Sequence, residues 1–137
     1  MILNRQRRVS LDEEDLRAFA TTLRRALRLS RESFAVVVVS DRRSAALNRR
    51  YRSQTQPTDV LSFAAGPSPR TNGYLGDVVI SAETARRNAR RYGHRLEEEV
   101  KLLMVHGLLH LLGYDHESDR GRMNRREHRL RRRLGLE

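Results

Sequence analysis

Cysteine is absent from this 137-residue chain, which excludes disulfides and every metal site built on thiolates. Tryptophan is absent too, and aromatic residues make up only 5% of the chain, so no platform for stacking the bases of single-stranded nucleic acid is evident. The chain has no apolar leader segment and no apolar run of transmembrane length. We therefore expect a cytoplasmic protein without a membrane partner, in which nitrogen and oxygen atoms hold any metal.

Lysine is almost absent as well. Of 28 basic residues only Lys101 is a lysine, and the net charge at pH 7 is +11. A preference for arginine over lysine is typical of a GC-rich genome, but it does not explain the surplus of positive over negative charge. Such a surplus favours a polyanionic partner, and nucleic acid is the first candidate.

Length and periodicity predict one α+β domain over residues 1–137. The hydrophobic fraction of 38% suffices for one core and argues against disorder. We expect a mixed sheet of about four strands packed by about five helices, with a buried metal-binding helix. Apolar spacing and capping residues predict strands at 2–4, 34–39, 59–64 and 74–81, helices at 11–28, 41–51, 82–92, from 96 onward and 118–134, and loops at 52–58 and 66–73. Ser10 and Glu13 predict a capping box for the first helix.

The motif with the clearest chemistry is His106-Gly-Leu-Leu-His110-Leu-Leu-Gly113-Tyr-Asp-His116. On a helix, His106 and His110 lie on one face, one turn apart. Gly113 is a natural helix stop, after which the chain can turn back and bring His116 towards the first two. Three imidazoles predict a zinc site with an open fourth position, although Ni²⁺ and Co²⁺ also accept imidazole. Histidine in so apolar a helix also needs a partner, and a metal supplies one.

Gly107 distinguishes this motif from that of the zinc proteases, which carry a glutamate after the first histidine as general base. A metal with three protein ligands can lower the pKa of bound water to about 7 and polarise a phosphoryl or carbonyl oxygen. A phosphodiester could accept the proton itself, and its transition state needs positive charge. The motif together with the basic charge therefore favours nucleic acid over peptide as the substrate.

Neighbouring polar residues leave alternatives open. Asp115 could orient a ligating imidazole, or it could cap the helix that begins near Ser118. His94 and His128 lack ligand spacing, and we interpret both as surface residues.

Three blocks of the sequence resemble the YbeY family of bacterial metal-dependent endoribonucleases. They are Leu47-Asn-Arg-Arg-Tyr-Arg52 continuing to Pro57-Thr-Asp-Val-Leu-Ser-Phe63, then Leu75-Gly-Asp-Val-Val-Ile-Ser81, and the histidine motif from His106 to His116. Together the blocks span most of residues 45–118. Glycine after the first histidine sets this family apart from the zinc proteases.

The resemblance implies that His106, His110 and His116 bind zinc and that Arg52 lies in the same cleft and takes part in catalysis. It also implies an α+β fold, action on single-stranded RNA, and a role in 3′-end maturation of small-subunit ribosomal RNA and in ribosome quality control. The ribosome or its small-subunit proteins are then the expected partners. From its position alone, Arg52 is one of many arginines, in a polar loop next to a predicted strand.

Two alternatives to the nuclease remain. One is a non-catalytic ribosome assembly factor with a structural metal, and the absence of a general base favours this alternative. The other is a hydrolase that acts on another substrate, which Gly107 makes less favourable. The arginine-rich last helix could bind RNA, or it could be a solvated amphipathic helix with Met123, Leu130 and Leu134 turned inward. Asp59 and Asp77 could face the cleft, although a hydrogen bond at a turn or strand end is the simpler role.

Overall fold

The computed structural model describes residues 1–52, 59–65, 73–114 and 120–136, with the side chain of Arg52 excepted. This part of the chain forms four strands and five helices. They are β1 (Ile2–Asn4), α1 (Glu13–Ala26), β2 (Phe34–Val39), α2 (Asp41–Arg52), β3 (Val60–Ala64), β4 (Gly76–Ser81), α3 (Ala82–Tyr92), α4 (Leu96–Leu111) and α5 (Arg122–Arg133). Of the loops predicted at 52–58 and 66–73, residues 53–58 and 66–72 lie outside the described residues.

The strands form one mixed sheet in the order β1-β2-β4-β3. β1 and β4 both run parallel to β2, whereas β3 runs antiparallel to β4. Val36 of β2 pairs with Ile2 on one side and with Val78 on the other. The α+β prediction, with four strands in a mixed sheet and five helices, is therefore confirmed.

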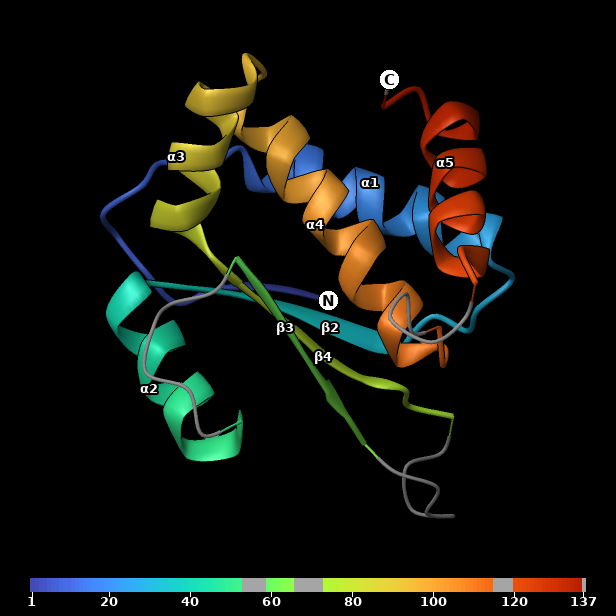
Figure 1. Ribbon diagram of the computed structural model, residues 1–137, viewed down its shortest axis with the longest axis horizontal. Coiled ribbons are helices and arrows are strands. Elements are labelled where there is room, and N and C mark those ends of the chain that lie inside the picture. Colours follow the sequence, from blue (N-terminus) through green and yellow to red (C-terminus); the bar gives the residue numbers. More distant parts are fainter. Residues whose placement is uncertain (53–58, 66–72, 115–119, 137) are drawn as a thin grey trace.

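The helices cover the two faces of this sheet unequally. Figure 1 shows α1, α3, α4 and α5 on one face and α2 alone on the other. The main core fills the space under the four helices and includes the fully buried Val36, Val78, Met104 and Leu108. A smaller cluster of Val39, Leu61 and Val79 lies on the α2 side. In the described part of the chain, no helix is long and apolar enough to cross a membrane.

Most helix ends follow the predicted chemistry. The side chain of Ser81 accepts a hydrogen bond from the backbone of Thr84 and begins α3, and Gly93 ends that helix in the left-handed conformation at φ 73°. The capping box at the first helix is wrong, because the carboxylate of Asp12, not the hydroxyl of Ser10, accepts from the backbone of Asp15. The last helix begins at Arg122 instead of Ser118, since Gly121 directly before it has a positive φ of 84°.

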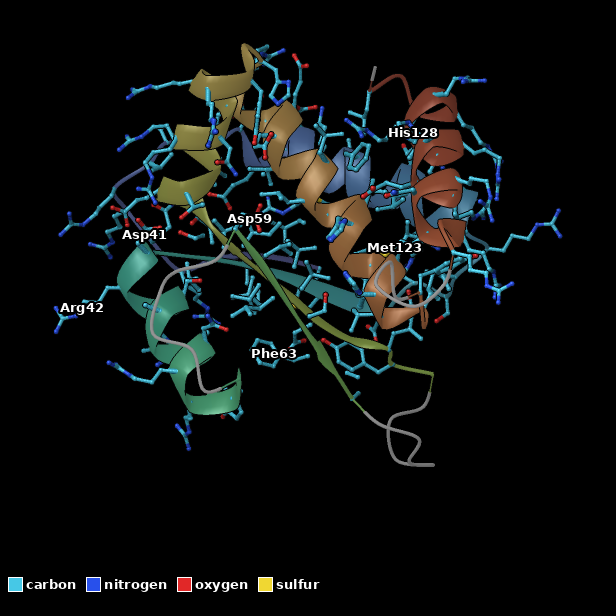
Figure 2. All side chains as sticks on the ribbon, viewed as in Figure 1. Asp41, Arg42, Asp59, Phe63, Met123 and His128 are labelled. Carbon is cyan, nitrogen blue, oxygen red and sulfur yellow. The ribbon has the colours of Figure 1, made fainter. Side chains whose placement is uncertain are left out.

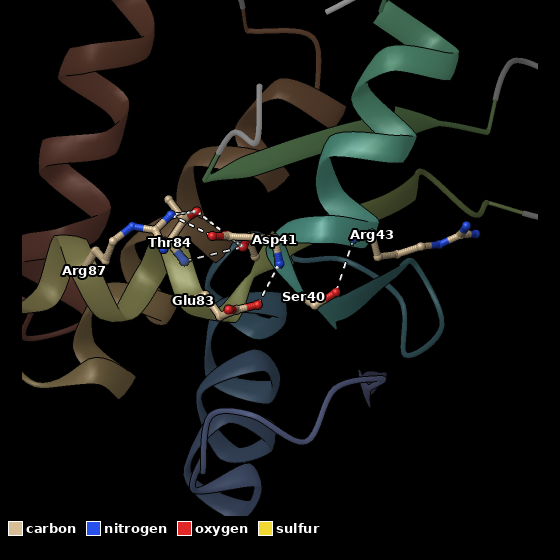
Figure 3. A network of polar contacts seen from close by, with 7 residues as sticks. Ser40, Asp41, Arg43, Glu83, Thr84 and Arg87 are labelled. Carbon is tan, nitrogen blue, oxygen red and sulfur yellow. Dashed lines mark hydrogen bonds and ion pairs between the residues drawn. The ribbon is translucent and has the colours of Figure 1, made fainter. Parts of the chain in front are cut away.

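Asp41, the first residue of α2, ties this helix to the start of α3. Its carboxylate accepts hydrogen bonds from the hydroxyls of Ser81 and Thr84 and pairs with Arg87 at 2.8 Å (Figure 3). Partial burial would raise the pKa of Asp41, but these hydrogen bonds and the charge of Arg87 outweigh it and hold the pKa below its usual value. The network fixes the orientation of α2, which ends at Arg52.

Candidate metal centre

His106 and His110 project from one side of the second half of α4. Their Nε2 atoms are 3.2 Å apart, and the ring planes meet at 77°. The spacing of four residues produces this geometry, since such residues are neighbours on a helix surface. The predicted convergence of these two imidazoles is thus present.

This separation fits a shared metal ion. Two nitrogens bound tetrahedrally to zinc at about 2.0–2.1 Å are about 3.3 Å apart. The third predicted ligand, His116, and the neighbouring Asp115 lie outside the described residues, so their roles stay predictions. Among the residues that the structure does describe, no three histidines or carboxylates gather in a way that could hold a metal.

A carboxylate that sequence reasoning missed supports His106. Oε1 of Glu127, on α5, lies 3.0 Å from Nδ1 of His106, and both side chains are partly buried. An imidazole that donates its Nδ1 proton to a carboxylate carries its lone pair on Nε2. This arrangement is usual for a metal-bound histidine.

This pairing affects the pKa of Glu127. Burial would raise the pKa, but the hydrogen bond with His106 and the nearby charges of Arg131 and His128 outweigh burial and hold the pKa below its usual value. A sequence signal was available. Glu127 follows the buried Met123 by four residues and precedes the buried Leu130 by three, so it lies on the inward side of α5.

The missing protease base has a packing explanation. A Cβ atom on Gly107 would lie 2.5 Å from Cγ1 of Val78 and 3.1 Å from Cγ2 of Val60, so there is no room for a side chain. The hydroxyl of Ser62 also donates to the backbone oxygen of Gly107 at 2.8 Å. Position 107 therefore faces the sheet, and a glutamate there could not reach the two histidines.

A cavity of about 440 Å³ opens beside His106. It runs along α4 towards the start of that helix and is lined by Asp59, Val60, Tyr92, His94, Glu99, Leu102, Leu103, His106, Glu127 and Arg131. Figure 2 shows Asp59 at the start of β3, on the side of the sheet that carries α3 and α4.

His94 belongs to this cavity. Its side chain is only 25% exposed, and its Nε2 lies 2.8 Å from Oε1 of Glu99. The interpretation of His94 as a surface residue is therefore wrong, because the turn between α3 and α4 folds its ring back against the helix. His128 is exposed on α5, as predicted.

The two strand-end aspartates have separate surroundings. Asp77 accepts a hydrogen bond from the hydroxyl of Tyr74, as expected for a residue at a strand end, and the pKa of Tyr74 is raised by burial and by this neighbour. Asp77 also lines a different cavity of about 1160 Å³, between α2 and the sheet. Phe63 projects from β3 into that region (Figure 2).

Arg52 is the last residue of α2, the helix on the opposite face of the sheet from α4 (Figure 1). Its side chain is outside the described part of the structure, so its expected place in the cleft stays a prediction. Asp59, the first described residue after Arg52, lines the cavity beside His106.

The family model described as endoribonuclease YbeY matches residues 1–135. The chain belongs to the YbeY family. This confirms the resemblance inferred from the three sequence blocks, and with it the prediction of an endoribonuclease, a hydrolase of RNA.

Several proteins named endoribonuclease YbeY are similar to this chain. The protein of Sulfurovum sp. is 39% identical over 139 residues, covering 98% of this chain and 90% of its own length. That of Koribacter versatilis is 40% identical over 136 residues, covering 99% and 86%. That of Aquifex aeolicus is 53% identical over 93 residues, covering 68% of this chain and 62% of its own length.

The fold has been solved before. A solution structure of a protein from Thermotoga maritima superposes with a TM-score of 0.65, covering 98% of this chain and 89% of the other at 24% identity. At that identity the likeness concerns the fold alone.

Proposed function

We propose that this chain is a metal-dependent endoribonuclease that cleaves single-stranded RNA, and that residues 1–137 act as one hydrolase domain. Its proposed biological role is 3′-end maturation of small-subunit ribosomal RNA and ribosome quality control in the cytoplasm. Membership of the YbeY family supports the activity. The observation that carries the metal-dependent mechanism is the 3.2 Å approach of the His106 and His110 Nε2 atoms, with Glu127 behind His106.

In this proposal His106, His110 and His116 hold Zn²⁺, with Ni²⁺ or Co²⁺ as alternatives. Such an ion supplies a Lewis acid that polarises a phosphoryl oxygen. Glu127 holds the ring of His106 in one orientation and one tautomer through Nδ1. Arg52 places a positive charge against the charge that develops on the phosphate.

A non-catalytic RNA-binding assembly factor with a structural metal is the second candidate. One observation favours it: position 107 packs against Val78 and Val60, so α4 brings no carboxylate next to His106 and His110 at the protease position. Glu127, the carboxylate that does approach, is engaged with Nδ1 of His106. Cleavage by the pure protein separates the two candidates.

The test uses purified protein that is stripped of metal, reloaded, and incubated with single-stranded RNA, duplex RNA and a peptide library. We expect cleavage of single-stranded RNA only, and its loss in His110→Ala and Arg52→Ala. Cleavage that is unchanged in both variants would come from a contaminating ribonuclease and would overturn the enzyme proposal. RNA binding that persists without any cleavage would favour the assembly factor.

Metal content is measured separately by elemental analysis. We expect about one equivalent of a transition metal in the wild type and much less in His110→Ala. His128→Ala is the matched control, because His128 is an exposed histidine and does not line the cavity beside His106. Equal metal content in all three proteins would contradict the ligand assignment.

A further inference from the structure

The cavity beside His106 has polar side chains that the metal centre does not use. Besides His106 and Glu127, the side chains of Asp59, His94 and Glu99 line it, away from the histidine pair. The apolar lining comes from Val60, Leu102, Leu103 and the rim residue Tyr92. A volume of about 440 Å³ with mostly apolar walls and a few convergent polar groups is typical of a small-molecule site.

Glu99 is the most informative of these side chains. The residue is only 5% exposed, and the ring of His94 is the one described side chain that hydrogen-bonds its carboxylate, at Oε1. A buried carboxylate is costly unless its acceptor sites are used. Two carboxylate oxygens offer about four such sites, so Glu99 retains acceptor capacity where it lines the cavity.

Arg131 contributes a guanidinium group, which carries several N–H donors, to the same lining. The cavity thus combines carboxylate acceptors with a guanidinium donor.

The two carboxylates disfavour a phosphate in the part of the cavity next to Asp59 and Glu99. Asp59 and Glu99 would repel an oxyanion there, although the chain as a whole carries a charge of +11. The edge of a nucleobase, in contrast, is neutral and presents N–H donors that carboxylates accept. Its flat faces also suit apolar walls.

The distance along α4 between Glu99 and His106 suits a single nucleotide. Glu99 and His106 are seven residues apart, which is two turns, so both lie on one side of the helix about 10 Å apart along its axis. A nucleotide whose phosphate lies at the histidines can therefore direct its base along α4 towards Glu99.

We propose that this cavity is a base-binding subsite, which takes the base next to the scissile phosphate and favours guanine over uracil. The edge of guanine presents two neighbouring N–H donors for carboxylates and one oxygen for a donor such as Arg131. Uracil presents two oxygens that flank one donor, and the carboxylates repel those oxygens. This inference rests on the proposed function, because it assumes that RNA is the substrate.

The test uses eight-nucleotide oligouridylates, each with a single guanosine at a different position. Binding is measured by fluorescence anisotropy on metal-loaded protein, with 2′-deoxy versions that cannot be cleaved through the 2′-hydroxyl. Cleavage is measured as kcat/KM on the ribose versions. We expect one guanosine position at which both affinity and kcat/KM exceed those of oligouridylate by about tenfold or more, as one good base-edge pair provides.

Two variants assign this preference to the cavity. Glu99→Gln keeps an acceptor for His94 but replaces one oxygen by a donor, so the guanine preference should fall below twofold while binding of plain oligouridylate stays within twofold. Glu98→Gln is the matched control, because Glu98 shares the first turn of α4 but does not line the cavity. Leu102→Phe, which narrows the cavity, should also abolish the preference and serves if Glu99→Gln fails to fold.

The outcomes are distinct. If Glu99 only secures the turn between α3 and α4 through His94, Glu99→Gln will weaken every oligonucleotide equally, and the inference is overturned. Cleavage without any guanine preference overturns the inference and leaves the proposed function intact. Guanine-selective binding without cleavage overturns the nuclease proposal and leaves the base site standing.

Discussion

Replacement of Gly107 by alanine tests the reasoning about why α4 lacks the protease glutamate. An alanine Cβ would lie 2.5 Å from Cγ1 and 3.2 Å from Cγ2 of Val78, and 3.1 Å from Cγ2 of Val60. Carbon atoms in favourable contact are about 3.5–4.0 Å apart, so roughly 1 Å must be relieved at the closest pair. Val78 is fully buried and β-branched, and therefore has little freedom to move away.

Two opposing effects set the change in the free energy of unfolding that Gly107→Ala causes. Alanine in place of glycine inside a helix stabilises by about 1 kcal/mol. Overpacking of a dense core costs about 1–3 kcal/mol, and three close contacts place this substitution at the upper end. We therefore expect Gly107→Ala to lower the free energy of unfolding by about 2 kcal/mol, measured by urea denaturation of metal-free protein.

A double-mutant cycle with Val78→Ala isolates the contact. Removal of both Cγ atoms destabilises the core by itself, but it also creates the space that the new methyl group needs. In the Val78→Ala background, Gly107→Ala should cost almost nothing or stabilise slightly, which is a coupling of about 2 kcal/mol. Gly107→Ala as stable as the wild type, or a coupling within about 0.5 kcal/mol of zero, would refute the packing explanation.

Three further predictions concern charged side chains. Glu127→Gln should weaken metal binding about 10–100-fold with little change in the fold, measured by competition with a chromophoric chelator; unchanged affinity would remove Glu127 from the site. Because the pKa of Asp41 is lowered in the folded state, its carboxylate contributes stability above its unfolded pKa of about 3.9, and that stability is lost as the pH falls through the lower folded value. The stability difference between wild type and Asp41→Asn should therefore be constant from pH 7 to 5 and shrink below about pH 4 in urea titrations; a difference that grows on acidification would contradict this. If α5 contacts RNA through its exposed arginines, Arg125→Gln with Arg129→Gln should reduce the slope of log K against log salt by about 0.7 per lost phosphate contact, whereas Arg7→Gln should leave it unchanged. Equal slopes in all these proteins would identify the arginine face of α5 as a solvated surface.

The local sequence pattern predicted the helices and strands of this fold, because their formation depends mainly on residues that are neighbours in the chain. The β-branched run 34–39 is strand β2 at the predicted bounds, and Ser81 and Gly93 delimit α3 through hydrogen bonds within a few residues. Prediction failed where two local solutions competed. Asp12 displaced Ser10 as the cap of α1, since both residues carry a suitable oxygen close to the helix start.

The pair His106 and His110 was determined by the sequence alone, because a spacing of four residues on any helix brings two imidazoles together. Family membership was equally readable, since it rests on the order of residues in three blocks.

Only the tertiary structure decided what surrounds these histidines. The Glu127 contact spans 21 residues, and Gly107 lies against Val78 because α4 packs on the sheet at that point. The pairing of His94 with Glu99 and the cavity beside them depend on how α3, α4, α5 and β3 meet. Such contacts arise from the docking of whole elements, which periodicity along the chain does not encode. The sequence therefore determined which residues could bind a metal, and the packing decided which side chains support them and where a base could enter.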